Sequence, residues 1–138
     1  MTRHLLAIDD VEDDFEMILK WAVEFKRLWK EGDDVAVNFM PLDTLAVGSI
    51  YEKPSTRTRV SFEVGINRLG GYPLTLLKND IQLGKSETVG DTSQVLSRFL
   101  GAMTYRCFSH DDVTELAKYA DVPVLNALSD KHLSLIHI

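Results

Sequence analysis

The sequence predicts an α/β domain built on a mainly parallel four-stranded sheet with helices on both faces. Four short apolar runs with strand character alternate with four segments of helical spacing. Parallel neighbours need right-handed crossovers, so this alternation places helices on both sides of the sheet. With 138 residues, 45% of them hydrophobic, the chain is long enough for one domain with a core of its own.

Helical spacing of apolar residues predicts the four helices. They run, in chain order, over about Asp10–Glu31, from Ser55 to Gly70-Gly71, from Asp91 or Thr92 to Gly101, and over His110–Ala120. Residue types at the ends support these boundaries, because Ser55 is a good N-cap and Gly32 is a natural C-cap.

Apolar runs bounded by turn residues predict the four strands. These are Leu42–Tyr51, Tyr72–Leu77, Met103–Phe108 and Val122–Leu128. The polar, glycine-containing segment Lys78–Gly90 is expected to form a loop. Ligands of parallel sheets bind beyond the carboxyl ends of the strands. We expect three features to converge there: Ser55–Arg59, Arg106 and Asn126–Asp130.

Charge and composition exclude several classes of protein. The formal net charge of −6 argues against a nucleic-acid binder, which needs a basic face. No apolar run is long enough to span a bilayer and the N-terminus lacks a signal-peptide core, so we expect a cytoplasmic protein without a membrane partner. Cys107 is the only cysteine, which fits a reducing compartment. The acidic residues between Asp9 and Glu16 are interpreted as a solvated helix start rather than a metal site, because no His or Cys joins them.

The run Ser55-Thr56-Arg57-Thr58-Arg59, at the start of the second helix, predicts an anion-binding site. The first N–H groups of a helix are unpaired, and the helix dipole is positive at that end. Three hydroxyl groups and two guanidinium groups add further donors there. Without more context, an ordinary capped helix with solvated arginines explains so short a pattern equally well.

The same five residues resemble the carbamoyl-phosphate motif Ser-x-Arg-Thr-Arg of the aspartate and ornithine carbamoyltransferases. The flanking residues are similar too: Glu52-Lys53-Pro54, Ser61-Phe62-Glu63 and Leu69-Gly70-Gly71. Later blocks resemble the ornithine branch in the family's order: Ile81–Thr88, Asp91-Thr92, Val95–Phe99 and Val122–Asp130. The likeness covers most of the chain from about Leu42 to His132. Lys53 and Gln82-Leu83-Gly84 favour the ornithine branch, and aspartate carbamoyltransferase is the close alternative.

The resemblance implies a role for each matching residue. The residues implied to bind carbamoyl phosphate are Ser55, Thr56, Arg57, Thr58, Gln82 and Arg106. Arg106 would reach the phosphate and the carbamoyl oxygen, and Gln82 would reach into a neighbouring subunit's site in a homotrimer of the full-length parent. Arg59 would support the helix start. Without the resemblance, Arg106 would be interpreted as a surface arginine and Gln82 as a loop residue.

The implied reaction is carbamoyl transfer in arginine biosynthesis. The side-chain amine of ornithine would attack the carbonyl carbon of carbamoyl phosphate, and the tetrahedral intermediate would give citrulline and phosphate. Arg57 and Arg106 are the implied catalytic residues, since their donors, with that of Thr58, would stabilise the developing charge. No metal or organic cofactor is expected, because carbamoyl phosphate is already activated.

The pattern departs from the family after Asp130. There the family has x-x-His-Pro-x-Gln, whereas Leu133, Ser134 and Ile136 stand at the positions of the His, Pro and Gln. We therefore expect residues 1–132 to form the carbamoyl-phosphate-binding domain and 133–138 to be an aberrant tail. We expect the amino-acid-binding domain that would bind ornithine to be absent and this chain alone to be inactive, or nearly so. The altered tail favours one further alternative, a non-catalytic anion-binding module.

Overall fold

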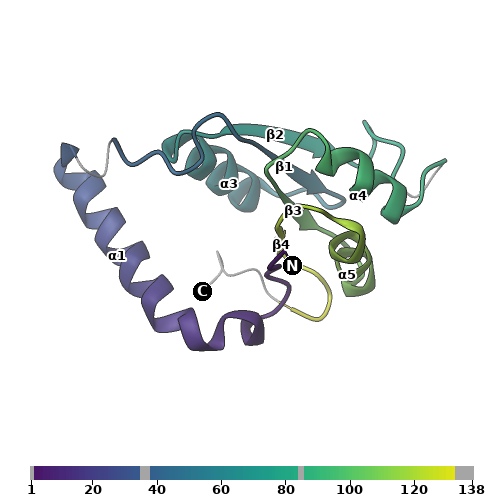
Figure 1. Cartoon of the computed structure of the whole chain (residues 1–138), viewed down its shortest axis with the longest axis horizontal. Coiled ribbons are helices and arrows are strands. Elements are labelled where there is room, and N and C mark those ends of the chain that lie inside the picture. Colours follow the sequence, from purple (N-terminus) through teal and green to yellow (C-terminus); the bar gives the residue numbers. More distant parts are fainter. Residues whose placement is uncertain (1, 35–37, 84–85, 133–138) are drawn as a thin grey trace.

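A four-stranded parallel sheet forms the centre of the computed structural model, which describes residues 2–34, 38–83 and 86–132 (Figure 1). Its strands are β1 (Ala46–Tyr51), β2 (Tyr72–Leu77), β3 (Ala102–Arg106) and β4 (Val124–Asn126). They lie in the order β2-β1-β3-β4, and each neighbouring pair is parallel. The predicted parallel sheet of four strands is confirmed.

Helices cover both faces of this sheet, as predicted. The helical elements are η1 (Ile8–Asp14, a 3₁₀-helix), α1 (Phe15–Glu31), α3 (Thr56–Arg68), α4 (Val89–Ser97) and α5 (His110–Tyr119). The crossover through α3 steps to one edge of the sheet and those through α4 and α5 step the other way, so right-handed connections put α3 on one face and α4 and α5 on the other. Side-chain contacts agree: Thr75 of β2 donates to Glu63 of α3, and Ser93 of α4 donates to the Leu116 carbonyl of α5 at 2.7 Å.

The main core lies on the face that α4 and α5 cover. Its buried residues are Ile50, Leu83, Leu100, Met103, Tyr105, Cys107, Val113, Leu116, Ala117 and Val124. Burial first, and then the charge of Glu52, raise the pKa of the Cys107 thiol to about 12. Cys107 therefore behaves as a small buried hydrophobe, as expected.

The N-terminal helix differs from the prediction in its first turns. The Asp10 carboxylate accepts the backbone N–H groups of Leu6 and Ala7 at 2.7 and 2.9 Å, and Val11 has non-helical angles (φ −131°, ψ 20°). The predicted start at Asp10 is therefore wrong, and the α-helix begins at Phe15. In Figure 1 α1 stands away from the sheet, and none of its residues is buried. Within the described residues, no helix is long and apolar enough to cross a membrane.

Strand β1 begins four residues later than predicted. The Leu45 N–H donates to the Leu42 carbonyl at 2.9 Å, and Thr44 has a positive φ of 66°, so the segment is a turn. Its leucines are apolar because they pack elsewhere: Leu42 lies against Gly71, and Leu45 against Gly101. The apolar pattern therefore reflected side-chain contacts of the turn and not extended backbone, and Leu45 stays 40% exposed.

The start of α4 is also corrected. The helix begins at Val89, not at the predicted Asp91 or Thr92, because Thr88 is its N-cap. The Thr88 hydroxyl accepts the Asp91 N–H at 3.0 Å, and the Asp91 side chain accepts the Thr88 N–H in return. The helix ends at Ser97, before the predicted Gly101.

The remaining elements match within a few residues. Strand β2 has the predicted bounds, and α5 ends one residue early. Strand β3 begins one residue earlier and ends two residues earlier than the predicted Met103–Phe108, and β4 is two residues shorter than the predicted Val122–Leu128 at each end.

Helix α3 ends in the glycine pair that the sequence indicates. Gly70 has a φ of 85°, its N–H donates to the Asn67 carbonyl at 3.0 Å, and the Gly71 N–H donates to the Ile66 carbonyl at 2.9 Å. These two bonds form a Schellman motif, which satisfies carbonyls at the helix end. A side chain at Gly70 would meet both an unfavourable φ and the Met40 Cβ, 2.7 Å from the added Cβ.

We expect Gly70→Ala to lower the free energy of unfolding by about 1–3 kcal/mol. Gly65→Ala is the matched control, because Gly65 lies within α3 and an added Cβ there has no neighbour within 4 Å. That substitution should raise the free energy of unfolding by about 0.5–1 kcal/mol through helix propensity. Urea unfolding of both variants measures the difference, and equal effects would contradict the role of Gly70.

Candidate functional site

The carboxyl ends of β1 and β3 meet at the start of α3. Tyr51 pairs with Arg106 in the β1–β3 register, and the Glu52 N–H donates to the Arg106 carbonyl at 2.9 Å. Three residues after Glu52 the chain enters α3 at its N-cap, Ser55. Arg106 therefore lies beside the helix N-terminus, although 48 residues separate it from Thr58.

A small cavity lies between the α3 N-terminus and Arg106. Its volume is about 190 Å³. It is lined by Pro54, Ser55, Thr56, Arg57, Thr58 and Arg106. Five of the six predicted binding residues therefore surround one cavity, and the predicted convergence of Ser55–Arg59 with Arg106 is met for all but Arg59.

The first turn of α3 is open to an anion. Ser55 occupies the N-cap position with an extended backbone (φ −156°, ψ 106°), but its hydroxyl makes no capping hydrogen bond. No acidic residue lies in the first turn to balance the helix dipole. The positive end of the helix thus has no anionic or capping side chain of its own, which favours a bound anion there.

Arg106 bridges from β3 to this helix end. Its Nη1 donates to the Thr58 hydroxyl at 3.0 Å, whereas its Nε is buried and has no hydrogen-bond partner. Among the described residues Arg106 makes no ion pair. A buried donor without an acceptor costs about 1–3 kcal/mol, so an acceptor from a ligand would be favourable at this position.

The two motif arginines differ in their surroundings. Arg59 donates to the Glu63 carboxylate at 2.9 Å, and Glu63 also accepts from Thr75. The bonds from Thr75 and then Arg59 hold the pKa of Glu63 below its usual range. Arg57 forms no ion pair with any described residue and lines the cavity. Arg59 is thus paired within α3, whereas Arg57 has no ion-pair partner among the described residues.

Comparison with known proteins identifies the family. Residues 3–134 match the family model described as aspartate/ornithine carbamoyltransferase, carbamoyl-P binding domain. The chain belongs to this family.

Individual relatives of this carbamoyltransferase-family chain are ornithine carbamoyltransferases. It is 45% identical over 130 residues to the enzyme of Picrophilus torridus and 46% identical over 131 residues to that of Methanopyrus kandleri, covering 94% of this chain in each case. Solved ornithine carbamoyltransferases from Pyrococcus furiosus and Coccidioides immitis superpose with TM-scores of 0.85 and 0.87 at 45% and 36% identity, over 93% and 94% of this chain. The chain spans only 40–41% of the length of these four proteins.

Gln82, the sixth predicted residue, lies away from the cavity of its own carbamoyl-phosphate-binding domain. It is exposed in the loop between β2 and α4, where its side-chain oxygen accepts from the Ser86 hydroxyl at 3.3 Å. Gly84 of the same predicted block lies outside the described residues, as do the three departures at positions 133, 134 and 136.

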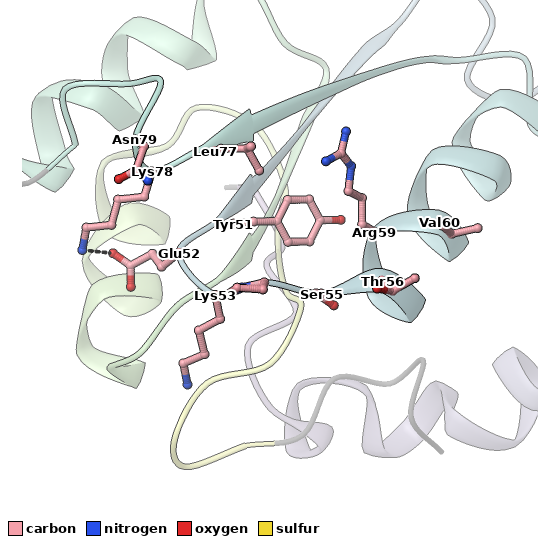
Figure 2. Close-up of a pocket in the computed structure, with 11 residues that line it drawn as sticks. Tyr51, Glu52, Lys53, Ser55, Thr56, Arg59, Val60, Leu77, Lys78 and Asn79 are labelled. Carbon is pink, nitrogen blue, oxygen red and sulfur yellow. Dashed lines mark hydrogen bonds and ion pairs between the residues drawn. The ribbon is translucent and has the colours of Figure 1, made fainter.

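A second hollow borders the same helix start, on the side of β2. This β2-side cavity measures about 540 Å³ and shares Pro54, Ser55 and Thr56 with the smaller one (Figure 2). In Figure 2 the Tyr51 ring points from β1 toward Arg59. Burial raises the pKa of Tyr51, whose hydroxyl has no hydrogen-bond partner. Sequence reasoning missed this cavity because part of its lining, Leu77–Asn79, lies at the end of β2 and not at the end of β1, the strand that leads into α3.

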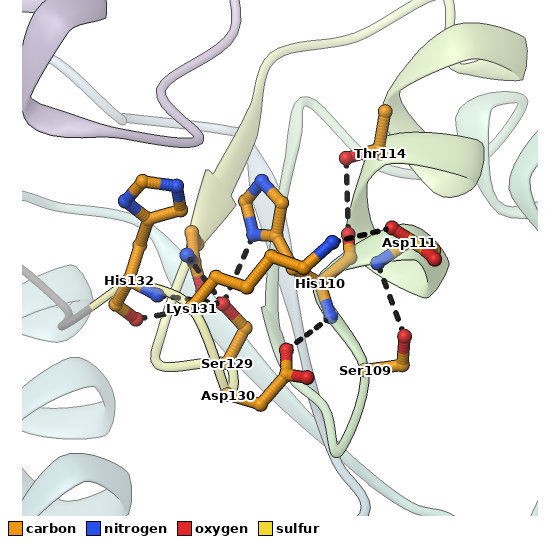
Figure 3. A network of polar contacts seen from close by, with 9 residues as sticks. Ser109, His110, Asp111, Thr114, Ser129, Asp130, Lys131 and His132 are labelled. Carbon is orange, nitrogen blue, oxygen red and sulfur yellow. Dashed lines mark hydrogen bonds and ion pairs between the residues drawn. The ribbon is translucent and has the colours of Figure 1, made fainter.

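The third predicted feature, Asn126–Asp130, reaches the same edge of the sheet but does not line the cavity. The Asn126 side chain donates to the Leu6 carbonyl and accepts the Leu128 N–H, both at 2.9 Å. Asp130 accepts the His110 N–H at the start of α5 at 2.7 Å (Figure 3). The expected convergence is therefore wrong for this segment, because its polar groups hold the loop against α5 and the N-terminal segment.

Two histidines lie together in this loop contact (Figure 3). The ring centroids of His110 and His132 are 4.6 Å apart, and His110 Nδ1 is 3.0 Å from the Ser129 hydroxyl oxygen. Burial, followed by the nearby His132 and Lys131, lowers the pKa of His110, although Asp130 and Asp111 oppose the shift.

This shift predicts a pH-dependent stability. Because the folded pKa of His110 lies below its ordinary value of 6.5, the unfolded chain binds more protons as the pH falls. The contribution of neutral His110 is present above pH 6.5 and is lost as the pH falls through the folded pKa. We expect His110→Gln to flatten the pH dependence of the free energy of unfolding below about pH 6.5, measured by urea unfolding. An unchanged slope in the variant would contradict this assignment.

Proposed function

We propose that this chain binds carbamoyl phosphate in the cavity between the α3 N-terminus and Arg106, as the donor-binding half of an ornithine carbamoyltransferase. The observation that carries the proposal is the position of Arg106. Its guanidinium is held over the first turn of α3 by Thr58, while its buried Nε lacks an acceptor. A phosphate oxygen at the helix N-terminus would accept from that Nε and from backbone N–H groups of the first turn together.

The donor groups suit both ends of carbamoyl phosphate. The N-terminal turn of α3, with the hydroxyls of Ser55 and Thr56, would bind the phosphate. Arg57 can bridge two phosphate oxygens, which a lysine cannot do. Thr58 and Arg106 lie together at the remaining wall of the cavity and would bind the carbamoyl oxygen.

Carbamoyl transfer would use these donors at the point where charge develops. The amine nitrogen of ornithine forms a bond to the carbonyl carbon, and the carbon–oxygen bond to phosphate then breaks as the proton lost by the amine passes to the leaving phosphate. Negative charge appears first on the carbonyl oxygen and then on the leaving phosphate. Arg57, Thr58 and Arg106 would stabilise both, and one such donor contributes about 3–4 kcal/mol to lowering a barrier of this kind.

Ornithine is the acceptor that the relatives favour over aspartate. The proteins compared above carry the name ornithine carbamoyltransferase at 36–46% identity. The chain spans about 40% of the curated relatives' length. Binding of the acceptor would therefore depend on a further domain, corresponding to the part of those proteins that this chain does not match.

Assembly into a trimer belongs to the same proposal. Gln82 is exposed on a loop and lies outside the cavity of its own chain. In a homotrimer this loop would bring Gln82 to the carbamoyl phosphate of a neighbouring subunit.

Arg57→Ala should weaken binding of carbamoyl phosphate by about 10- to 100-fold, because a charged bidentate contact is lost. Arg68→Ala is the matched control, since it removes the same charge at the other end of α3, where Arg68 lies over the Trp29 ring. The control should change the Kd less than twofold. Calorimetric titration of the 138-residue chain with carbamoyl phosphate and with inorganic phosphate measures both. Equal Kd values for Arg57→Ala and the wild type would contradict the assignment.

The 138-residue chain should bind carbamoyl phosphate yet form no measurable citrulline from it and ornithine. Its cavity provides groups for the donor, and none of its described lining residues is assigned to the amino-acid acceptor. A colorimetric citrulline assay, with a full-length ornithine carbamoyltransferase as positive control, checks this. Turnover comparable to the positive control would contradict the proposal that this chain is only the donor-binding half of the enzyme. Binding without turnover would also fit a non-catalytic anion-binding module.

A further inference from the structure

Glu52 lies where the ends of β1, β2 and β3 meet, beside the turn that leads into α3. Its side chain is only 4% exposed. One carboxylate oxygen accepts from Lys78 Nζ at 2.7 Å and the other accepts from the backbone N–H of Phe108 at 2.8 Å. Figure 2 shows the Glu52 carboxylate directed toward Lys78, away from the Ser55–Thr56 turn.

These contacts hold the chain on both sides of Arg106. The backbone N–H of Glu52 donates to the carbonyl of Arg106, and its carboxylate accepts from the residue two positions later, Phe108. The first bond extends the hydrogen bonding between β1 and β3 by one residue. The second joins the segment that follows β3 to the segment that follows β1. Arg106 thus starts from a fixed backbone when its guanidinium reaches Thr58.

The same side chain fixes the base of the loop that carries Gln82. Lys78 is the first residue after β2, and its N–H donates to the Tyr51 carbonyl at 3.0 Å while its ammonium group donates to Glu52. One carboxylate therefore connects the ends of β1, β2 and β3.

The charges around Glu52 keep it ionised. Burial alone would raise the pKa of Glu52, but the bonds from Lys78 and the Phe108 N–H outweigh burial and lower it. The other titratable groups that face it are Tyr105, Cys107 and Asp112, and burial together with the charge of Glu52 raises the pKa of each. Lys78 supplies the balancing positive charge.

We infer that Glu52 is a positioning residue for carbamoyl phosphate: by holding the Phe108 N–H it sets the position of Arg106 relative to the α3 N-terminus. This inference rests on the proposed function of the cavity. Removing the Glu52 carboxylate would change the affinity for carbamoyl phosphate in opposite directions through its charge and through its hydrogen bond to Phe108. A negative charge near the cavity repels a phosphate, so removing it would tighten binding if Glu52 acted through charge alone. A loss of affinity on removing the acceptor is therefore opposite in sign to the electrostatic effect, and it is the result expected from a displaced Arg106.

The pair Glu52→Gln and Glu52→Ala separates these effects. Both variants remove the charge, but the Gln side chain has the same length and keeps an oxygen that can accept the Phe108 N–H. We expect the Kd for carbamoyl phosphate to stay within about threefold of the wild type in Glu52→Gln and to rise roughly tenfold or more in Glu52→Ala, since small misplacements of a binding group are costly. Calorimetry on the 138-residue chain measures the Kd values. The Arg106 Nε–H resonance without ligand should shift only in Glu52→Ala.

Ser93→Ala is the control for loss of stability alone. It removes the buried hydroxyl that donates to the Leu116 carbonyl, far from the cavity lining. It should lower the melting temperature without changing the Kd. If Glu52→Ala fails to fold, Glu52→Asp replaces it, because that variant keeps the charge and withdraws the acceptor by one methylene group; the Kd should rise in it as well.

The outcomes distinguish the inference from the function on which it rests. If the wild-type chain binds carbamoyl phosphate and Glu52→Ala or Glu52→Asp binds it equally well, the positioning role is wrong and the proposed function still stands. A Kd that rises in Ser93→Ala in proportion to lost stability also overturns it. A wild-type chain that binds neither carbamoyl phosphate nor phosphate overturns the proposed function, and the positioning role with it.

Discussion

The parallel register between β1 and β3 is the constraint on which the candidate site depends. It pairs Tyr51 with Arg106, and so brings a side chain at the end of one strand against the helix that follows the other. A slip by one residue would turn Arg106 to the opposite face, away from Thr58. The register is held by the core on that opposite face, where Ile50 and Tyr105 are fully buried. Packing far from any ligand therefore determines the spacing of the groups that would bind one.

Charge is distributed around α3 so that its N-terminus stays positive. The first turn has no acidic residue, and Glu63, one turn further on, pairs with Arg59. Arg57 and Arg106 make no such pair within the described part of the chain. The orphaned Nε of Arg106 costs stability where it lies, and an anion would remove that cost.

The sequence was most informative where the signal is local. The capping position of Ser55, the glycine pair at the end of α3 and the alternation of strands with helices all depend on near neighbours, and each was predicted correctly. Errors arose where an apolar or polar residue served a distant partner. Leu42 and Leu45 looked like strand residues because they pack against remote glycines. Asn126 looked like a site residue because the sequence pattern does not show the hydrogen bond from its side-chain amide to the Leu6 carbonyl. The strand pattern placed Arg106 at the ligand-binding edge of the sheet, but its role as a ligand contact came only from the family resemblance, because a lone arginine at a strand end has no local signature.

Glu52 illustrates why such contacts matter more for geometry than for stability. An ion pair with a buried carboxylate gains little over a well-packed apolar pair, because desolvation of the Glu52 charge offsets its attraction to Lys78. Apolar side chains at positions 52 and 78 would therefore close this edge of the sheet about as well. They would not accept the Phe108 N–H, since a hydrogen bond has a direction and apolar contact has none. The carboxylate is thus best explained by what it orients: the backbone from which Arg106 extends toward Thr58.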